Sequence, residues 1–474
     1  MKQKITLPSG FSFDGTNMLG EGRITEQELH QLAPRIAQAA AAVEEIRHTG
    51  KAKKHLSKDG TPEPVYFPRL PYPGDHSPNT HELLDELKAF GESVRQNEDA
   101  VIFCGVGGSY LGGKVLYDCA GSEFWPHRPE HLPSIFFSGN NVDSEDMTEI
   151  KEWLEVLAES KKPLNVLLVP ISKSGTTMET TAAFLYFYDT LSKQPDRFQV
   201  HGAVVTDKGL ESGPLNRLAR KFNWPMFDVP VGIGGRFSVL STPGLVVGAV
   251  LGLDLPELLR GARDMDEACK TADIETNPAL FNATLKYVSA ANHGATIEVI
   301  MPYAMRLKAL GEWYVQLLAE SLGKRNNREG ETVFYGRTPV VAIGTTDMHA
   351  QTQMHQEGRR DKVVQFLFVE SWKGKLTVHN PFPEIAEYQG YENLDAADAL
   401  QAAMEANEEA LSSDNRLNAL YTLPELSEYT LGQLFYFLML SIAYEGELAD
   451  VDAYDQPGVE IYKRIMKAKL KKNR

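Results

Sequence analysis

Residues 164–187 set the firmest limits on how this chain can fold. The segment opens with the apolar, β-branched run Val166–Ile171, which is short enough to be a buried strand. A polar loop of small residues follows, and apolar residues then return at helical spacings from Met178 onward. A strand that leads through small residues into a helix is a typical anion-binding arrangement, because the loop offers hydroxyls and N–H groups and the helix dipole favours negative charge. The loop carries the hydroxyl side chains of Ser172, Ser174, Thr176 and Thr177.

An alternative interpretation of this loop is a simple helix N-cap, with Thr177 as the capping residue and Glu179 in the first helical turn. One Ser or Thr is enough to cap a helix. Four hydroxyls in six residues exceed that need, so we favour an anion-binding loop.

Short apolar runs alternate with helical patterns on both sides of this segment. Such alternation predicts a doubly wound parallel sheet with helices on its faces. It stops in a helical region from Thr242 to about Ala290 and then restarts, which indicates a second α/β domain. The predicted strands are Ala100–Cys104, Ser134–Phe137, Val166–Ile171, Gly202–Val205 and Met226–Val229 in the first part, and Ala295–Pro302, Val340–Gly344 and Val363–Val369 in the second.

The expected fold is therefore α/β, with two domains that are each a mostly parallel sheet flanked by helices. A length of 474 residues is compatible with roughly two to four domains. We expect a helical or irregular segment over residues 1–75, the first domain over 76–255 and the second over 256–445. A helical tail is expected over 446–474.

Composition narrows the class of protein. A formal net charge of −16 disfavours sequence-independent binding of nucleic acid, which needs surplus Lys and Arg. The basic stretch 463–474 is interpreted as a solvated helix end. No apolar stretch is long enough for a membrane span, and the N-terminal residues lack the apolar core of a secretory signal. Three scattered cysteines form neither a disulfide framework nor a zinc motif. We expect a cytoplasmic protein without a metal site.

Two further segments are rich in glycine. The first, Gly105–Gly113, follows a predicted strand and allows close backbone approach to a ligand, although its spacing differs from that of the dinucleotide-binding motif. The second, Gly234–Ser238, could bring Arg236 to a bound anion. For each segment the alternative is an ordinary turn, with Arg236 at the surface.

A predicted helix over residues 306–322 carries a candidate base. Its apolar residues share one stripe, and Gln316 and Glu320 stand four residues apart at the edge of that stripe. A partly desolvated carboxylate has a raised pKa and suits general-base chemistry. The alternative is an exposed Glu320 that pairs with Lys324.

Two more candidates lie near the ends of predicted elements. His349 follows the strand Val340–Gly344, although an ordinary loop histidine is the favoured interpretation of this segment taken alone. His355 comes six residues later, which does not place two metal ligands on one helical face. Near the C-terminus, a Pro-Gly turn after Gln456 begins a helix that contains Lys463, a residue that would usually be solvent-exposed.

Six segments, taken together and in their order, resemble the phosphoglucose isomerase family. The resemblance spans Gly105 to Lys463, and six motifs in the same order are far more specific than any one of them. The SKSGTT form of the loop is similar to that of the shorter bacterial members. The segments are GVGGSYLG, ISKSGTTMET, GGRFS, QLLAESLGK, MHAQTQMHQEG and QPGVEIYK.

The resemblance implies two sugar-isomerase (SIS) domains, a homodimer and no cofactor. It also implies the interconversion of glucose 6-phosphate and fructose 6-phosphate as the activity. Residues matching the family's phosphate loop are Ser172, Ser174, Thr176 and Thr177, and those matching its sugar contacts are Gly108, Ser109, Gln316 and Gln456.

Four residues match the family's catalytic groups. Glu320 corresponds to the base that moves a proton between C2 and C1, and Arg236 to the group that stabilises the enediolate. His349 and Lys463 correspond to the pair that assists ring opening, with the histidine supplied by the partner subunit.

Three alternatives remain open from the sequence. A sugar-phosphate sensor would keep the hydroxyl-rich loop but would not need Glu320, Arg236, His349 and Lys463 in register. A nucleotide-dependent oxidoreductase is disfavoured by the glycine spacing. An isomerase that also accepts mannose 6-phosphate would have the same motifs.

Overall fold

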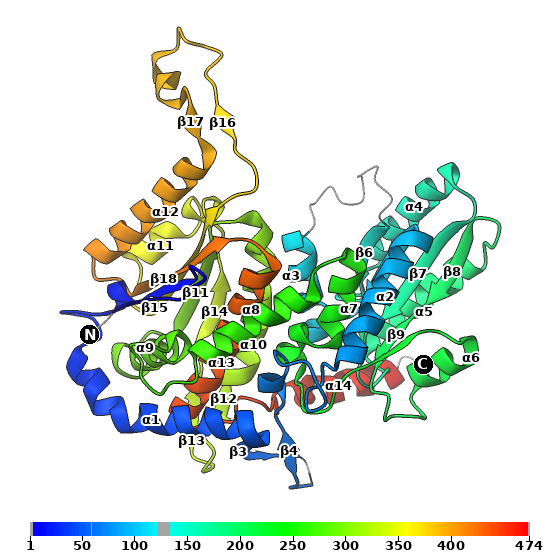
Figure 1. Ribbon diagram of the computed structural model, residues 1–474, viewed down its shortest axis with the longest axis horizontal. Helices are drawn as coiled ribbons and strands as arrows, with labels where there is room; N and C mark the ends of the chain where they lie inside the picture. Colours follow the sequence, from blue (N-terminus) through cyan, green and yellow to red (C-terminus); the bar gives the residue numbers. More distant parts are fainter. Residues whose placement is uncertain (1–2, 58, 121–132, 473–474) are drawn as a thin grey trace.

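The computed structural model describes residues 3–57, 59–120 and 133–472, and it contains two mostly parallel sheets that lie side by side (Figure 1). The first sheet has the strand order β6-β5-β7-β8, and all its pairings are parallel. A short parallel pair, β9 and β10, adjoins this sheet, because Val205 of β9 forms a parallel bridge with Ile171, the residue after β7. The strands of the first sheet and of this pair are β5 Ala100–Cys104, β6 Ser134–Ser138, β7 Leu164–Pro170, β8 Phe198–Gly202, β9 Val204–Thr206 and β10 Met226–Asp228.

Alternate residues of these strands enter two different cores, as the two-residue period of a strand requires. Ile102 and Leu168 pack with the helices of one face, whereas Val101 and Leu167 belong to the larger core on the other. The first face is covered by α4 Ser144–Ser160 and α5 Met178–Ser192, and the second by α2 His81–Asn97, α3 Leu111–Ala120 and α7 Thr242–Leu251.

The second sheet has the order β1-β2-β18-β15-β11-β14. The four strands β18, β15, β11 and β14 are parallel to one another. The strands β1 and β2 add an antiparallel edge next to β18. The strand β2, near the start of the chain, therefore pairs with β18, which lies near the end of the chain. The strands are β1 Lys4–Thr6, β2 Ser12–Asp14, β11 Ile297–Pro302, β14 Thr338–Val341, β15 Lys362–Ser371 and β18 Asn418–Glu425.

Helices cover both faces of the second sheet. The apolar helix α13 is buried along almost its whole length and forms the centre of the core. The prediction of mostly parallel sheets flanked by helices is thus confirmed. One face carries α8 Leu255–Ala268, α9 Pro278–His293, α10 Lys308–Leu322 and α13 Glu428–Leu448, with α1 Glu26–Thr49 outside them, and the other carries α11 Thr352–Glu357 and α12 Ala396–Ser413.

Two sequence predictions need correction. The strand β18 was not among the predicted strands, yet it pairs along β15 in the second sheet. The predicted strand Gly202–Val205 is divided between β8, which pairs with β7, and β9, which pairs with β10.

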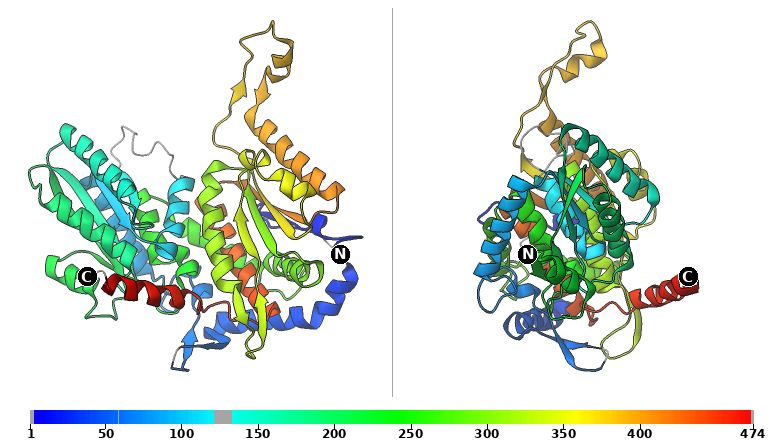
Figure 2. Two further views of the ribbon diagram at one scale, coloured as in Figure 1. Left: turned by 180° about the vertical axis from the view of Figure 1, so that it is seen from behind. Right: turned by 90° about the vertical axis from the view of Figure 1, so that its right-hand side faces the viewer.

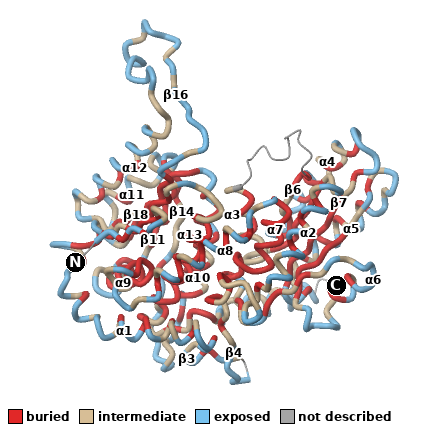
Figure 3. The backbone as a smooth tube through the Cα atoms, in the orientation of Figure 1, coloured by how far each residue is buried: buried red, intermediate tan, exposed pale blue. Residues whose placement is uncertain are grey.

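Several of the remaining elements lie at the periphery. An arm over residues 372–395 projects from the second sheet (Figures 1 and 2), and Figure 3 shows that most of it is exposed. The last helix, α14, extends from the second sheet's side toward the first (Figure 2). No helix in the described ranges is long and apolar enough to cross a membrane. The remaining elements, with their bounds, are β3 Lys51–Leu56, β4 Pro62–Pro64, α6 Pro214–Phe222, β12 Lys324–Asn326, β13 Thr332–Tyr335, β16 Thr377–Val378, β17 Leu394–Asp395, α14 Val459–Lys472 and the 3-10 turns Thr16–Met18, Phe67–Arg69, Gly107–Ser109, Gly235–Leu240, Met305–Leu307, Thr346–Met348 and Ala386–Tyr391.

Candidate active site

A cleft of about 1520 Å³ lies at the carboxyl ends of β5 and β7. Ligands of open α/β proteins bind at this edge, where loops leave the strands. The cleft is bordered by the hydroxyl-rich loop, by the glycine loop after β5, by α10 of the second sheet and by α14. Ten of the residues predicted from sequence line it: Gly108, Ser109, Ser172, Ser174, Thr176, Thr177, Gln316, Glu320, Gln456 and Lys463.

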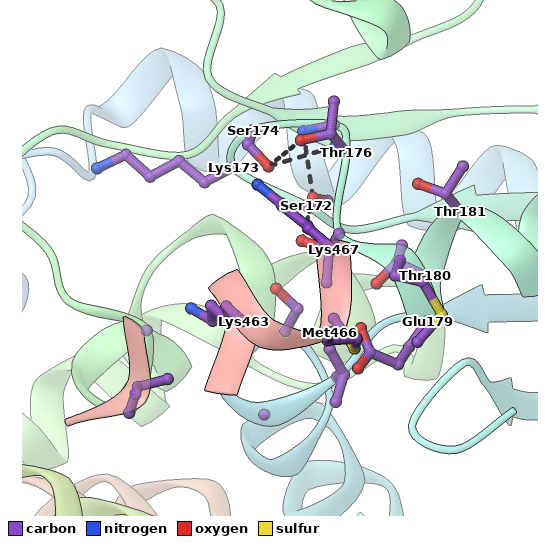
Figure 4. A pocket seen from close by; sticks show the side chains of 18 of the residues that line it. Ser172, Lys173, Ser174, Thr176, Glu179, Thr180, Thr181, Lys463, Met466 and Lys467 are labelled. Carbon is purple, nitrogen blue, oxygen red and sulfur yellow. Dashed lines mark hydrogen bonds between the residues drawn. The ribbon is translucent and has the colours of Figure 1, made fainter. Parts of the chain in front are cut away.

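The hydroxyl-rich loop is held by its own side chains. The Ser172 and Thr177 hydroxyl oxygens are 2.9 Å apart across the loop, and the Gly175 N–H donates to Ser172 Oγ at 3.2 Å. Ser174 and Thr176 are exposed, with their hydroxyl oxygens 3.0 Å apart (Figure 4). Thr177 makes no side-chain cap of α5, which removes the simple N-cap interpretation. Two hydroxyls thus shape the loop, and two face solvent where an anion could bind.

The two glycine segments lie against each other beside this loop. A Cβ on Gly108 would lie 2.0 Å from the carbonyl oxygen of Gly235. The two backbones can therefore pack in direct contact only because Gly108 has no side chain. The Ser238 hydroxyl also donates to the Gly108 carbonyl at 3.2 Å. This close packing fixes the 3-10 turn that contains Arg236 against the loop after β5.

Arg236 is fully buried beneath the cleft, and each of its N–H groups has a partner. Its Nε donates to Ser321 Oγ at 2.7 Å, and its Nη1 donates to the Glu320 carboxylate and to the amide oxygen of Gln456. Its Nη2 donates to the carbonyl oxygens of Ala453 and Asp455. Burial lowers the pKa of the guanidinium, and the carboxylates of Glu320 and Asp455 oppose that effect. Arg236 is therefore not the surface residue of an ordinary turn.

Glu320 lies at the cleft end of α10, with its side chain 27% exposed. Its Oε2 accepts from Arg236 Nη1 at 3.4 Å, and its Oε1 accepts from Gln316 Nε2 at 3.1 Å. Lys324 does not pair with this carboxylate, because its Nζ donates to the backbone carbonyl of Glu320 instead. The geometry leaves a partly exposed carboxylate beside a fixed cation, which is an arrangement suited to proton transfer.

The chain's last helix completes one wall of the cleft. Lys467 of α14 extends toward the hydroxyl-rich loop (Figure 4). Lys463 of the same helix also lines the cleft, and its Nζ lies 3.5 Å from Glu460 Oε1. Arg464, Lys467, Lys469 and Lys471 are exposed, as expected for a solvated helix end, yet Lys467 and Lys471 also line the cleft. Their spacing of four residues from Lys463 places all three on one helical face. That spacing was the available sequence signal, and it was missed.

Two predicted residues are not part of the cleft lining: Arg236 is buried beneath the cleft, whereas His349 is not brought to it at all. His349 is exposed, directly after the 3-10 turn Thr346–Met348. In the described ranges, no group of three or more His, Cys, Asp or Glu is arranged to hold a metal ion.

Two mostly parallel sheets flanked by helices, with a hydroxyl-rich cleft at the strand ends of the first sheet, define an α/β protein with a candidate anion-binding site. The model of the phosphoglucose isomerase family matches residues 73–474. A glucose-6-phosphate isomerase of Carboxydothermus hydrogenoformans is 38% identical over 392 residues, which are 82% of this chain and 82% of that protein. The chain belongs to the phosphoglucose isomerase family.

Further relatives cover nearly the whole chain. A glucose-6-phosphate isomerase of Rubrobacter xylanophilus is 32% identical over 460 residues, 97% of this chain and 98% of that protein. A hypothetical protein of Thermus thermophilus has a TM-score of 0.79 at 29% identity, covering 97% of this chain and 99% of that one. A glucose-6-phosphate isomerase of Chlamydia trachomatis has a TM-score of 0.80 at 21% identity, covering 99% and 90%, and this likeness supports the fold.

Proposed function

We propose that the protein is an aldose–ketose isomerase that interconverts glucose 6-phosphate and fructose 6-phosphate. The observation that carries the proposal is the pairing of the Glu320 carboxylate with the buried guanidinium of Arg236 in the cleft that also contains the hydroxyl-rich loop. Isomerisation needs a base that loses and regains a proton and a fixed cation beside the oxygen that becomes negative. The membership of the family supports the same reaction.

The phosphate group of the substrate binds the hydroxyl-rich loop in this proposal. Ser174 and Thr176 supply exposed hydroxyls, and the N-terminus of α5 adds backbone N–H groups and a favourable dipole. Lys463 and Lys467 add positive charge from the facing helix. Binding energy from the phosphate, which is remote from C1 and C2, positions those carbons against Glu320.

Proton transfer then takes place at Glu320. The carboxylate removes the proton from C2 of the open-chain aldose, and the C1 carbonyl becomes an enediolate whose negative charge faces Arg236. Return of that proton to C1, together with transfer of the hydroxyl proton from O2 to O1, gives the ketose. Hydrogen and electrons move within one substrate molecule, so the reaction balances without an added oxidant or reductant. Gln316 and Gln456 line the same cleft and contact the sugar hydroxyls.

Ring opening precedes this transfer, and we assign it to His349 and Lys463. An imidazole titrates near neutral pH and can move the proton of the ring oxygen. Since His349 lies away from the cleft of its own chain, we propose a homodimer in which each subunit supplies this histidine to the other. Exposed apolar side chains support a subunit contact at the arm: Leu376, Phe382, Tyr388 and Tyr391.

A cytoplasmic location is part of the proposal. All three cysteines, Cys104, Cys119 and Cys269, are free, as is usual for proteins of a reducing compartment.

The purified protein tests the function directly. It should convert glucose 6-phosphate to fructose 6-phosphate, and the reverse, in a buffer with a chelator and without nicotinamide. Mannose 6-phosphate, assayed in parallel, measures the breadth of specificity. Binding of the sugar phosphates without any conversion would contradict the proposal and favour a sensor.

A further inference from the structure

Lys324 is the first residue after α10 and its cap, and its side chain is only 5% exposed. Its ammonium group lies between two parts of the chain that are far apart in sequence. Nζ donates to the carbonyl oxygen of Glu320 at 2.6 Å and to the carbonyl oxygen of Asp455 at 2.8 Å. Nζ is also 3.2 Å from Asp455 Oδ1. The ammonium group thus donates to two backbone carbonyls, and the Asp455 carboxylate adds an ion pair.

The first contact stabilises the end of α10. The last carbonyls of a helix have no partner within the helix, and a lysine near the C-terminus can satisfy one of them. Here the satisfied carbonyl is that of Glu320 itself. The contact therefore restrains the backbone from which the proposed base projects.

The second contact fixes the segment 449–458 between α13 and α14. The carbonyl oxygen of Asp455 accepts from both Lys324 Nζ and Arg236 Nη2, so one backbone group joins the two cations. The neighbouring residue, Gln456, accepts from Arg236 as well. Lys324 thereby links the base, the buried guanidinium and a predicted sugar contact into one arrangement.

We propose that Lys324 is a positioning residue for the isomerisation step. Its contacts hold the Glu320 carboxylate beside Arg236 and beside the segment that contains Gln456. This inference rests on the proposed role of Glu320 as the base. Lys324 does not contact the substrate in this arrangement, because its donors point to backbone carbonyls and to Asp455. Its effect is on the geometry of the base, and a displacement of about 1 Å at a reacting group can lower the rate about 100-fold.

His55 offers a matched control. Its Nδ1 lies 2.9 Å from Asp452 Oδ2, so it also fixes the segment 449–458 from a buried position, but it has no hydrogen bond to α10. Removing either contact loosens the same segment. Only the removal of Lys324 frees the end of α10.

The experiment compares Lys324→Met with His55→Phe. We expect both variants to melt at a lower temperature than the wild type. For Lys324→Met we expect kcat to fall about 100-fold while KM and competitive inhibition by inorganic phosphate change less than about threefold. For His55→Phe we expect kcat within about twofold of the wild type. Lys324→Gln, which retains a polar group at this position, is assessed by the same criteria if Lys324→Met does not fold.

A second readout separates positioning from stability. When Lys324→Met is introduced into Glu320→Gln, the exchange of the C2 proton should fall no further, because groups that act as a unit are not additive. A wild-type kcat for the Lys324 variant, an equal loss in His55→Phe, or a further loss in the double variant would each overturn the inference. A Glu320→Gln protein with full activity would remove the proposed base, and the role of Lys324 with it. If Glu320→Gln is inactive and the Lys324 variant has a normal kcat, only the inference about Lys324 is overturned, and the proposed function stands.

Discussion

Arg236 Nη1 lies 3.4 Å from Glu320 Oε2, although 84 positions separate the two residues in the chain. The guanidinium is fully buried and the carboxylate is partly exposed to the cleft. In the proposed reaction the negative charge leaves the carboxylate when it takes the proton and develops on the substrate oxygen. Arg236 is close enough to Glu320 to compensate the charge in both states without moving, which is how preorganised electrostatic stabilisation works.

Glu320→Gln tests the base. The substitution keeps the shape of the side chain but removes the proton acceptor, so kcat should fall by about 10²–10⁴-fold. Substrate binding should survive, because the hydroxyl-rich loop is separate. Turnover and the exchange of the C2 proton with solvent measure the effect.

Glu312→Gln is the matched control on the same helix, since Glu312 is exposed and lies outside the cleft lining. It should keep normal kcat and normal exchange. Exchange at the wild-type rate in Glu320→Gln would exclude this residue as the base.

Arg236→Lys tests the fixed cation. A lysine supplies at most three donors where the guanidinium makes five contacts, so some buried oxygens lose their partners. Each unsatisfied group costs about 1–3 kcal/mol, and kcat should fall about 10²–10³-fold. Thermal melting and kcat are measured together, with Arg263→Lys at the surface of α8 as the control. A lower melting temperature with an unchanged kcat would leave Arg236 a purely structural role.

Much of the fold could be predicted because its central strands are continuous apolar runs. The strand β5 coincides with its predicted bounds, and β7, β11 and β15 lie within a few residues of theirs. β18 was missed because Asn418 and Pro424 interrupt the apolar pattern and helices flank it on both sides. The edge strand β1 and its neighbour β2 are three residues long, too short for any periodicity.

The site was predictable where side chains carry the chemistry and unpredictable where the backbone does. Glu320 and the loop hydroxyls are visible as residue types at particular spacings. The partners of Arg236 include the carbonyl oxygens of Ala453 and Asp455, and a carbonyl has no sequence signature. The contacts of Lys324 could not be predicted for the same reason. Its expected ion pair with the Glu320 carboxylate is instead a hydrogen bond to the Glu320 backbone carbonyl.

Ser174→Ala and Thr176→Val test the phosphate loop. Both hydroxyls are exposed at the cleft, whereas Ser172 is buried and shapes the loop, so these two can be removed with little damage to the fold. Each lost hydrogen bond to a phosphate is worth about 1.5–3 kcal/mol. KM should therefore rise about 10- to 100-fold per substitution with kcat nearly unchanged. Ser192→Ala, at the exposed far end of α5, is the control. An unchanged KM in the double variant would place phosphate binding elsewhere.

Glu28 predicts a pH dependence of stability. Burial raises its pKa, but hydrogen bonds from the Thr25 N–H, Asn292 and the Thr25 hydroxyl, together with His293, outweigh burial and lower the pKa to about 2. Because the pKa is lower in the folded state, the stabilisation is fully present above the ordinary value of 4.5 and is lost as pH falls toward 2. The difference in free energy of unfolding between the wild type and Glu28→Gln should therefore shrink from pH 7 to pH 3.5.

Urea unfolding at several pH values measures this difference, and Glu45→Gln on the exposed side of α1 should show no such trend. A difference that is constant with pH would mean that the ionised carboxylate of Glu28 does not contribute.

Mixing two inactive variants tests whether His349 acts in the neighbouring subunit. In a heterodimer of Glu320→Gln and His349→Ala, one site would combine Glu320 of one subunit with His349 of the other and would be intact, while the second site would lack both. Random exchange makes half of the dimers mixed, and each mixed dimer has one working site of two, so about a quarter of the wild-type activity should return. The subunits are exchanged by mild unfolding and refolding and assayed on closed-ring glucose 6-phosphate. His349→Ala mixed with wild-type protein that has been refolded in the same way provides the control for losses. If the mixture stays as inactive as its components, His349 does not complete the site of a partner, and the ring-opening role must be sought among groups on the same chain, beginning with Lys463 and Lys467 of α14.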